Sequence, residues 1–180
     1  VPRGWSRTFP NLVAMESIRG FEFTTFDQKD TDLAPKHLTM MPYARNVVGP
    51  MDFTPVCFGE IRGKQRRTSN AFELALTVVL QSGIQHYVEI PESMAKQPDY
   101  VKTYMQTIPR KWDDVKLLDG FPGKYVVMAR RSGDKWYIGG INSQTENQKV
   151  IIDISKLKTP DGNNITLITD GDTNRSFIQK

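Results

Sequence analysis

The feature that most constrains this chain is a change in hydrophobic pattern near Pro109. Before it, apolar residues recur at helical spacing between loops. After it, short segments alternate with period two and are bounded by Gly, Asp, Asn or Pro. The two patterns bury different faces and require different elements. We therefore predict a helix-containing part, residues 1–108, followed by an antiparallel all-β part, residues 109–180.

Three helices are predicted in the first part. One begins at Pro35, a favourable first helical residue, and runs towards residue 48 with a kink or early end at Pro42. A second has Asn70 as its N-cap and Glu73 three residues later, which is the capping-box spacing. Its apolar stripe continues to the residues before Gly83. A third helix covers residues 98–106.

Strands are predicted from short apolar runs bounded by turn residues. Residues 51–58 form one brief buried strand in the first part. The strands of the second part are predicted at 115–118, 125–129, 136–141, 150–154 and 165–168. Residues 161–164, Asp-Gly-Asn-Asn, form the last predicted turn. Trp136 and Tyr137 are interpreted as packing a sheet face rather than as a carbohydrate platform.

Composition excludes several classes of function. The 180 residues carry 24 Lys and Arg against 20 Asp and Glu, a net charge of +4 that is too mild to indicate nucleic acid. The basic run at residues 62–67 is interpreted as a solvated loop. A single cysteine, Cys57, rules out an intramolecular disulfide and a multi-cysteine zinc site. No apolar run approaches the roughly 20 residues of a membrane helix. We expect neither a nucleic-acid nor a membrane partner.

Glu16 and Glu22 are the residues that most suggest chemistry. They lie six residues apart, around Gly20, in a stretch predicted to be a loop. Paired carboxylates serve glycoside hydrolysis or ligate a hard cation such as Ca²⁺. The alternative is that both are surface charges. The two histidines, His37 and His86, are interpreted as structural, and no nucleophile elbow, phosphate-binding loop or zinc-type His pair is present.

Several blocks of the sequence resemble the C-terminal part of glycoside hydrolase family 97. The most specific is Gly-Pro-Met-Asp-Phe-Thr-Pro at residues 49–55. The other blocks, in chain order, are residues 7–12, 16–23, 37–45, 73–81, 112–120 and 125–138. The resemblance covers nearly the whole chain in order, which a chance motif match would not do.

The resemblance implies a fold and a site. Family members have an N-terminal β-super-sandwich, a central (β/α)₈ barrel and a C-terminal β-sandwich. Residues 1–108 would then be the C-terminal part of the barrel, and residues 109–180 the small antiparallel β-sandwich. The family holds Ca²⁺ with glutamates: Glu16 matches a calcium ligand, and Glu22 matches the general acid, which also lies beside the ion. His37 is not assigned, because Lys36 stands where the family commonly has an acidic residue.

The leading hypothesis is part of a calcium-dependent, exo-acting α-glycosidase that releases terminal α-linked glucose or galactose from oligosaccharides. Its partners would be the oligosaccharide and the rest of the parent chain, namely the super-sandwich and the first part of the barrel. We expect the chain alone to be inactive, and the parent to be periplasmic or secreted. Retaining and inverting mechanisms both remain open. The alternatives are a non-catalytic carbohydrate-binding or structural module, and a degenerate barrel that has lost activity.

Overall fold

The computed structural model describes residues 4–61, 63–157 and 164–180. Six helices and five strands are assigned within these ranges, with one short 3₁₀ helix, η1. The helices are α1 (Trp5–Thr8), α2 (Phe21–Thr24), α3 (Gln28–Ala44), α4 (Asn70–Val79), α5 (Pro91–Met94) and α6 (Asp99–Thr107). The strands are β1 (Asp114–Phe121), β2 (Tyr125–Ser132), β3 (Lys135–Asn142), β4 (Ile168–Asp170) and β5 (Phe177–Gln179), and η1 is Ile154–Leu157.

Three extended segments of the first part lie side by side. Met15 and Met51 form a parallel bridge, and Asp52 N donates to Met15 O at 2.9 Å. On the other side, Met51 N donates to Gln81 O at 2.9 Å, and Val88 N donates to Pro55 O at 3.1 Å. From Met51 to Pro55 the partner moves from Gln81 to Val88, so residue numbers increase in the same direction on both segments, and these segments also run parallel. The predicted strand at 51–58 is thus an extended, largely buried segment with only a bridge at Met51.

Helix α3 is longer than its sequence pattern predicts. It begins at Gln28 rather than Pro35, because the Asp27 side chain accepts a hydrogen bond from Lys29 N at 3.1 Å and caps the helix there. Pro35 and Pro42 both lie inside the helix, which ends at Ala44. The expected start at Pro35 is therefore wrong.

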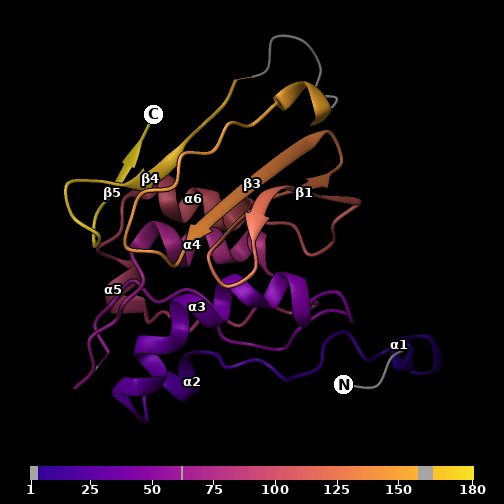
Figure 1. Cartoon of the computed structure of the whole chain (residues 1–180), viewed down its shortest axis with the longest axis horizontal. Helices are drawn as coiled ribbons and strands as arrows, with labels where there is room; N and C mark the ends of the chain where they lie inside the picture. The colour runs from indigo at the N-terminus through magenta and orange to yellow at the C-terminus, as the bar shows by residue number, and fades with distance from the viewer. Residues whose placement is uncertain (1–3, 62, 158–163) are drawn as a thin grey trace.

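Helix α4 is the centre of the molecule. Ser69 is its N-cap, and its side chain accepts from Phe72 N at 3.1 Å, so the predicted Asn70 cap is wrong by one residue. Figure 1 shows α4 lying between α3 and the strands β1–β3. Buried residues of α4 share one core with residues from both halves of the chain. That core includes Leu38, Met51, Phe53, Phe72, Leu76, Val79, Val126 and Ile141.

The strands β1, β2 and β3 form an antiparallel sheet in that order, which confirms the antiparallel strands predicted at 115–118, 125–129 and 136–141. The sheet packs closely on α4 at Gly139, where an added Cβ would lie 2.9 Å from the carbonyl oxygen of Ala75. Any larger residue would push the sheet away from the helix. An all-β arrangement with small antiparallel sheets is thus confirmed for the second part.

The remaining strands β4 and β5 pair antiparallel with each other. β4 begins at Ile168, later than predicted, and β5 is not predicted at all. Residues 150–153 are not a strand, and η1 follows them, so the strand predicted at 150–154 is wrong. The predicted turn at 161–164 falls mainly on residues 161–163, which lie outside the described residues.

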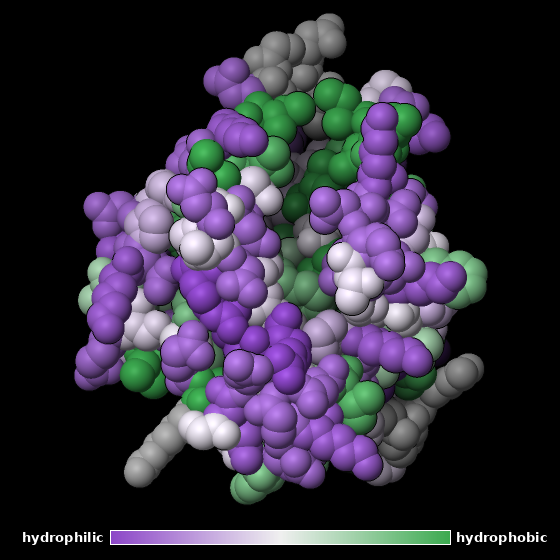
Figure 2. Space-filling model, turned by 60° about the vertical axis from the view of Figure 1, so that its left-hand side comes forward, coloured by the Kyte–Doolittle hydropathy of each residue, from purple (hydrophilic) through white to green (hydrophobic). Residues whose placement is uncertain are grey.

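The basic run at 62–67 is not a uniformly solvated loop. Arg66 is only 4% exposed, whereas Arg67 is exposed and pairs with Asp32 at 2.7 Å. Arg62 lies outside the described residues. Within the described ranges, no helix has the length and apolar character needed to cross a membrane. Figure 2 shows a face that is mostly hydrophilic, with apolar side chains gathered along a hollow.

Candidate active site

Glu22 is placed by the start of a short helix and by a threonine from another segment. It lies in the first turn of α2, so the predicted loop is wrong at this residue. Its Oε2 atom accepts a hydrogen bond from the Thr54 hydroxyl. Thr54 Oγ1 in turn accepts from the backbone N–H of Phe21 at 3.1 Å. The carboxylate is therefore attached to the middle parallel segment rather than free in solvent.

Gly20 lies beside this contact and has no room for a side chain. A Cβ added there would lie 2.7 Å from both Glu22 Oε2 and Thr54 Oγ1. Phe21, 8% exposed, and Ile18, 4% exposed, anchor the backbone on either side of Gly20 in the core. The sequence therefore requires glycine here for steric reasons, and the side chains of Glu22 and Thr54 occupy the space that a larger residue would take.

Glu16 is exposed, and its position is set through its backbone. The buried guanidinium of Arg45 donates to the carbonyl oxygen of Glu16 at 2.9 and 3.1 Å and to that of Met15 at 2.6 Å. It also binds the carbonyls of Gly49 and Pro50, at 3.0 and 3.2 Å. Burial lowers the pKa of Arg45. One residue at the end of α3 thus joins the segment of Glu16 to the start of the segment that holds Thr54.

Backbone strain accompanies this loop. Ser17, between the two glutamates, has φ of 83°, which non-glycine residues rarely adopt. Such conformations cost on the order of 1–3 kcal/mol and are retained where the surroundings enforce them. The bonds from Arg45 to the carbonyls of Met15 and Glu16 supply that enforcement here, on the N-terminal side of Ser17.

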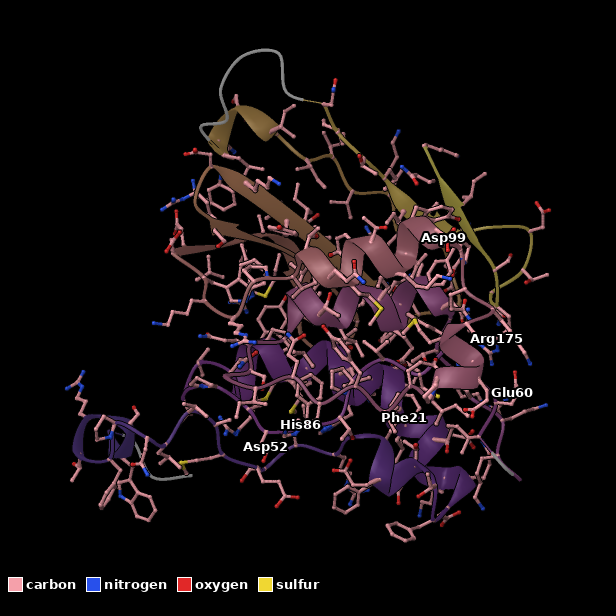
Figure 3. All side chains as sticks on the ribbon, turned by 180° about the vertical axis from the view of Figure 1, so that it is seen from behind. Phe21, Asp52, Glu60, His86, Asp99 and Arg175 are labelled. Carbon is pink, nitrogen blue, oxygen red and sulfur yellow. The ribbon has the colours of Figure 1, made fainter. Side chains whose placement is uncertain are left out.

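Both histidines lie near these segments. His37 Nε2 accepts a hydrogen bond from Arg19 N at 3.1 Å, and burial, followed by the charge of Arg19, lowers the pKa of His37. His86 Nδ1 lies 3.7 Å from Asp52 Oδ1, and Figure 3 shows the two side chains next to each other. Asp52 and His86 are both exposed, on the middle and third parallel segments. His37 therefore supports the loop of Arg19, while Asp52 and His86 add polar groups to an open face.

The two glutamates do not form a complete calcium site. No group of three or more His, Cys, Asp or Glu side chains that could hold a metal is found among the described residues. Calcium takes 6–8 oxygen ligands, and Glu16 and Glu22 supply two carboxylates. An ion held by these two side chains would therefore need most of its ligands from elsewhere.

Sequence reasoning singles out the two glutamates but misses the residues that hold them. Thr54 stands inside the specific block at residues 49–55, yet nothing in its sequence neighbourhood indicates a partner 32 positions earlier. Arg45 lies within the predicted helix as an ordinary basic residue. Gly20 lies in a stretch predicted to be a loop and gives no further signal. The contacts of Thr54 with Glu22, of Arg45 with Glu16 and of Gly20 with Thr54 are long-range and become visible only in the fold.

Parts of this chain are similar in sequence to known proteins. Residues 111–180 match the family model described as "Glycosyl-hydrolase 97 C-terminal, oligomerisation". A probable retaining alpha-galactosidase of Streptomyces bingchenggensis is 39% identical over 140 residues. The retaining alpha-galactosidase of Bacteroides thetaiotaomicron is 34% identical over 152 residues. Each alignment covers 78% of this chain but only 21% and 22% of those two relatives.

Solved structures of glycoside-cleaving enzymes are also similar to this chain. A beta-arabinopyranosidase crystal structure superimposes on the whole chain with a TM-score of 0.91 and 32% identity, over 29% of its own length. A family 97 enzyme from Pseudoalteromonas sp. strain K8, in complex with panose, covers 78% of this chain with a TM-score of 0.68 and 32% identity, over 23% of its own length. The relatives named here are all glycoside-cleaving enzymes or members of that family.

The chain is similar over 78% of its length to a glycoside hydrolase family 97 enzyme, and residues 111–180 match that family's C-terminal model. It spans about a fifth of the length of the curated relatives it matches.

Proposed function

We propose that this chain is part of a retaining, exo-acting α-glycosidase that releases terminal α-linked galactose from oligosaccharides. The observation that carries the proposal is the Glu22 carboxyl held by Thr54 on a parallel segment, in a chain similar to two proteins named as a retaining and a probable retaining alpha-galactosidase. Terminal α-linked glucose, which the resemblance equally implied, is the second substrate to be measured.

Residues 1–108 are proposed to be the last βα units of a (β/α)₈ barrel. The three parallel extended segments, joined through Met15, Met51 and Gln81, support this proposal. Helices α3 and α4 follow the first and second of these segments, as barrel helices follow strands. Active-site groups of such barrels lie at the C-terminal ends of the strands. Glu16 directly follows Met15 of the first segment, and Thr54 lies within the second segment, residues 51–58.

In this proposal Glu22 is the general acid. A carboxyl group beside the scissile bond protonates the departing oxygen, and a second carboxylate, outside this chain, attacks the sugar carbon. Glu16 and Glu22 are also proposed to supply two of the oxygen ligands of a Ca²⁺ ion, with the remaining ligands from other parts of the full-length protein. The proposed location is periplasmic or secreted.

Residues 111–180 are proposed to contribute to oligomerisation, the role in the description of the matching family model. Large apolar side chains are exposed in this part, including Phe121 at 55%, Ile151 at 86% and Ile165 at 70%. Exposed apolar surface of this kind is typical of a protein–protein contact. Such a surface could equally contact other parts of the full-length chain, and the oligomeric state of the full-length enzyme decides between the two.

A third candidate substrate is a terminal β-arabinopyranoside. It is favoured by the superposition of the whole chain on a beta-arabinopyranosidase, with a TM-score of 0.91. A pentopyranoside lacks the exocyclic hydroxymethyl group of a hexopyranoside, so the two activities differ in how the pocket accommodates that group. Comparison of kcat/KM for aryl α-galactoside, α-glucoside and β-arabinopyranoside in the full-length enzyme ranks the three substrates directly.

The acid role is tested with Glu22→Gln in the full-length enzyme. Loss of a general acid costs about 10²–10⁴-fold on a disaccharide, whose leaving group needs protonation. A dinitrophenyl glycoside needs little protonation, so its hydrolysis should fall far less. Equal losses on both substrates would show that Glu22 is not the acid.

Calcium is tested in the same enzyme. Exhaustive dialysis against a chelator should abolish activity, and added Ca²⁺ should restore it. Glu16→Gln should impair both substrates similarly and respond to excess Ca²⁺, since affinity follows the number of charged ligands. Full activity after chelation would contradict the calcium proposal and leave the acid role of Glu22 unaffected.

A further inference from the structure

The hydrogen bonds around Thr54 have a defined direction. The backbone N–H of Phe21 can only donate, so Thr54 Oγ1 is the acceptor of that 3.1 Å contact. A hydroxyl has one hydrogen of its own, and Thr54 directs it to Glu22 Oε2. Among the hydrogen bonds of the described residues, Thr54 Oγ1 donates to no other acceptor.

This direction fixes which carboxyl oxygen faces Thr54. With Thr54 donating, Oε2 is the acceptor. Glu22 Oε1 makes no hydrogen bond among the described residues, so it is the oxygen left free to face a substrate.

We propose that Thr54 is a positioning residue for Glu22: its hydroxyl binds Oε2 and orients the carboxyl group so that Oε1 is free to act. This inference rests on the proposed role of Glu22 as general acid. Gly20 leaves room for this pair, because a Cβ at that position would lie 2.7 Å from both Glu22 Oε2 and Thr54 Oγ1. Proton donation depends on a fixed geometry, so a carboxyl free to rotate delivers its proton less efficiently.

The test uses Thr54→Val in the full-length enzyme, which removes the hydroxyl and keeps the branched shape. We expect kcat on a disaccharide to fall about 10-fold or more, and hydrolysis of a dinitrophenyl glycoside to change by less than about 3-fold. Thr54→Ser keeps the hydroxyl and should restore kcat on the disaccharide. Thr31→Val is the matched control. Thr31 is also a hydroxyl held near α2, with Oγ1 donating to Thr24 O at 2.9 Å, but it makes no hydrogen bond to Glu22.

A double-mutant cycle separates positioning from stability. If Thr54 acts through Glu22, Thr54→Val should have little further effect on disaccharide hydrolysis in the Glu22→Gln background. Thermal midpoints of all variants show whether they are folded. The proposal is overturned if Thr54→Val lowers both substrates equally, if serine fails to restore kcat, or if the two substitutions are additive.

Failure of this inference is distinguishable from failure of the proposed function. If Glu22→Gln itself shows no dependence on the leaving group, the acid assignment fails and this inference fails with it. If Glu22→Gln shows that dependence and Thr54→Val does not, only the positioning role of Thr54 is wrong.

Discussion

Glu73 is fully buried in α4, where its carboxyl accepts a hydrogen bond from the Thr68 hydroxyl at 2.5 Å. Burial raises its pKa from 4.5 to about 7, although Thr68 and the nearby positive charge of Arg66 oppose the shift. Arg66 is itself buried, and its guanidinium is held by the carbonyls of Phe58 and Thr68 and by Asn70. The position predicted to be a capping-box glutamate is therefore an internal titratable group.

The raised pKa of Glu73 predicts a loss of stability as pH rises. Between about pH 4.5 and pH 7 the folded protein keeps the proton while the unfolded chain releases it, so unfolding becomes easier with increasing pH. The whole loss is on the order of 3 kcal/mol. The thermal midpoint of the full-length enzyme should accordingly be lower at pH 8 than at pH 5.

Glu73→Gln isolates this effect, because glutamine has no charge at either pH. The decrease in thermal midpoint between pH 5 and pH 8 that is due to Glu73 should disappear in Glu73→Gln. It should persist in Glu92→Gln, which removes an exposed glutamate of α5. An equal decrease in thermal midpoint in the wild type and in Glu73→Gln would mean that another titratable group is responsible.

Helix α4 and strand β2 are joined by a buried arginine. Arg130, 3% exposed, donates from Nε to Val78 O at 2.6 Å and from Nη2 to Val79 O at 3.3 Å. These carbonyls are at the helix C-terminus, where partial negative charge favours a cation. Burial lowers the pKa of Arg130 to about 10, so it remains protonated at neutral pH. The helix end and the sheet are thus held by one charged side chain.

Arg130→Met should destabilise the protein by about 2–4 kcal/mol, since methionine keeps the apolar contacts but leaves two buried carbonyls without donors. Arg131→Met is a matched control on the neighbouring position. Its side chain is 36% exposed and pairs with Asp113 at 3.8 Å, so that substitution should cost less than about 1 kcal/mol. Unfolding by urea measures both. A cost for Arg130→Met no larger than for Arg131→Met would contradict the role assigned to Arg130.

At the scale of the whole molecule, the turn between β4 and β5 is attached to the start of α4. Arg175 donates to Thr68 O at 2.7 Å and to Arg66 O at 2.8 Å, and lies 3.3 Å from Glu60. Figure 3 shows Arg175 and Glu60 close together. Asn70 N also donates to Asn174 O at 2.8 Å. The end of the chain is therefore held by residues more than 100 positions earlier.

Arg175→Met should release this turn without disturbing the core around α4. We expect faster amide hydrogen exchange at residues 168–179 in the full-length enzyme and unchanged exchange in β2, because exchange reports local opening. Arg175→Lys tests the shape of the donor: an ammonium group cannot reproduce the fork that reaches two carbonyls, so exchange should be intermediate. Unchanged exchange at 168–179 in Arg175→Met would show that the turn is held by its other contacts.

Local pattern is sufficient to predict several parts of this protein. The strands β1, β2 and β3 follow from their alternation and turn residues, which are local properties. Helix α6 is predicted for the same reason, and α4 to within one residue at its start. Glu16 and Glu22 stand out because the residues around them resemble a family whose motif is itself contiguous. Their roles stay predictions until the full-length enzyme is measured.

Tertiary structure decided what local pattern cannot encode. Glu73 and Arg66 look solvated in sequence, but Glu73 is fully buried in α4 and Arg66 is buried against Phe58, and burial raises the pKa of Glu73. The support of Glu22 by Thr54 and of Glu16 by Arg45 joins residues about 30 positions apart, and the β4–β5 turn reaches α4 across about 100. Sequence periodicity determines which face an element buries. Only the packed chain determines which partner that face meets, because hydrogen bonds and burial depend on distance in space.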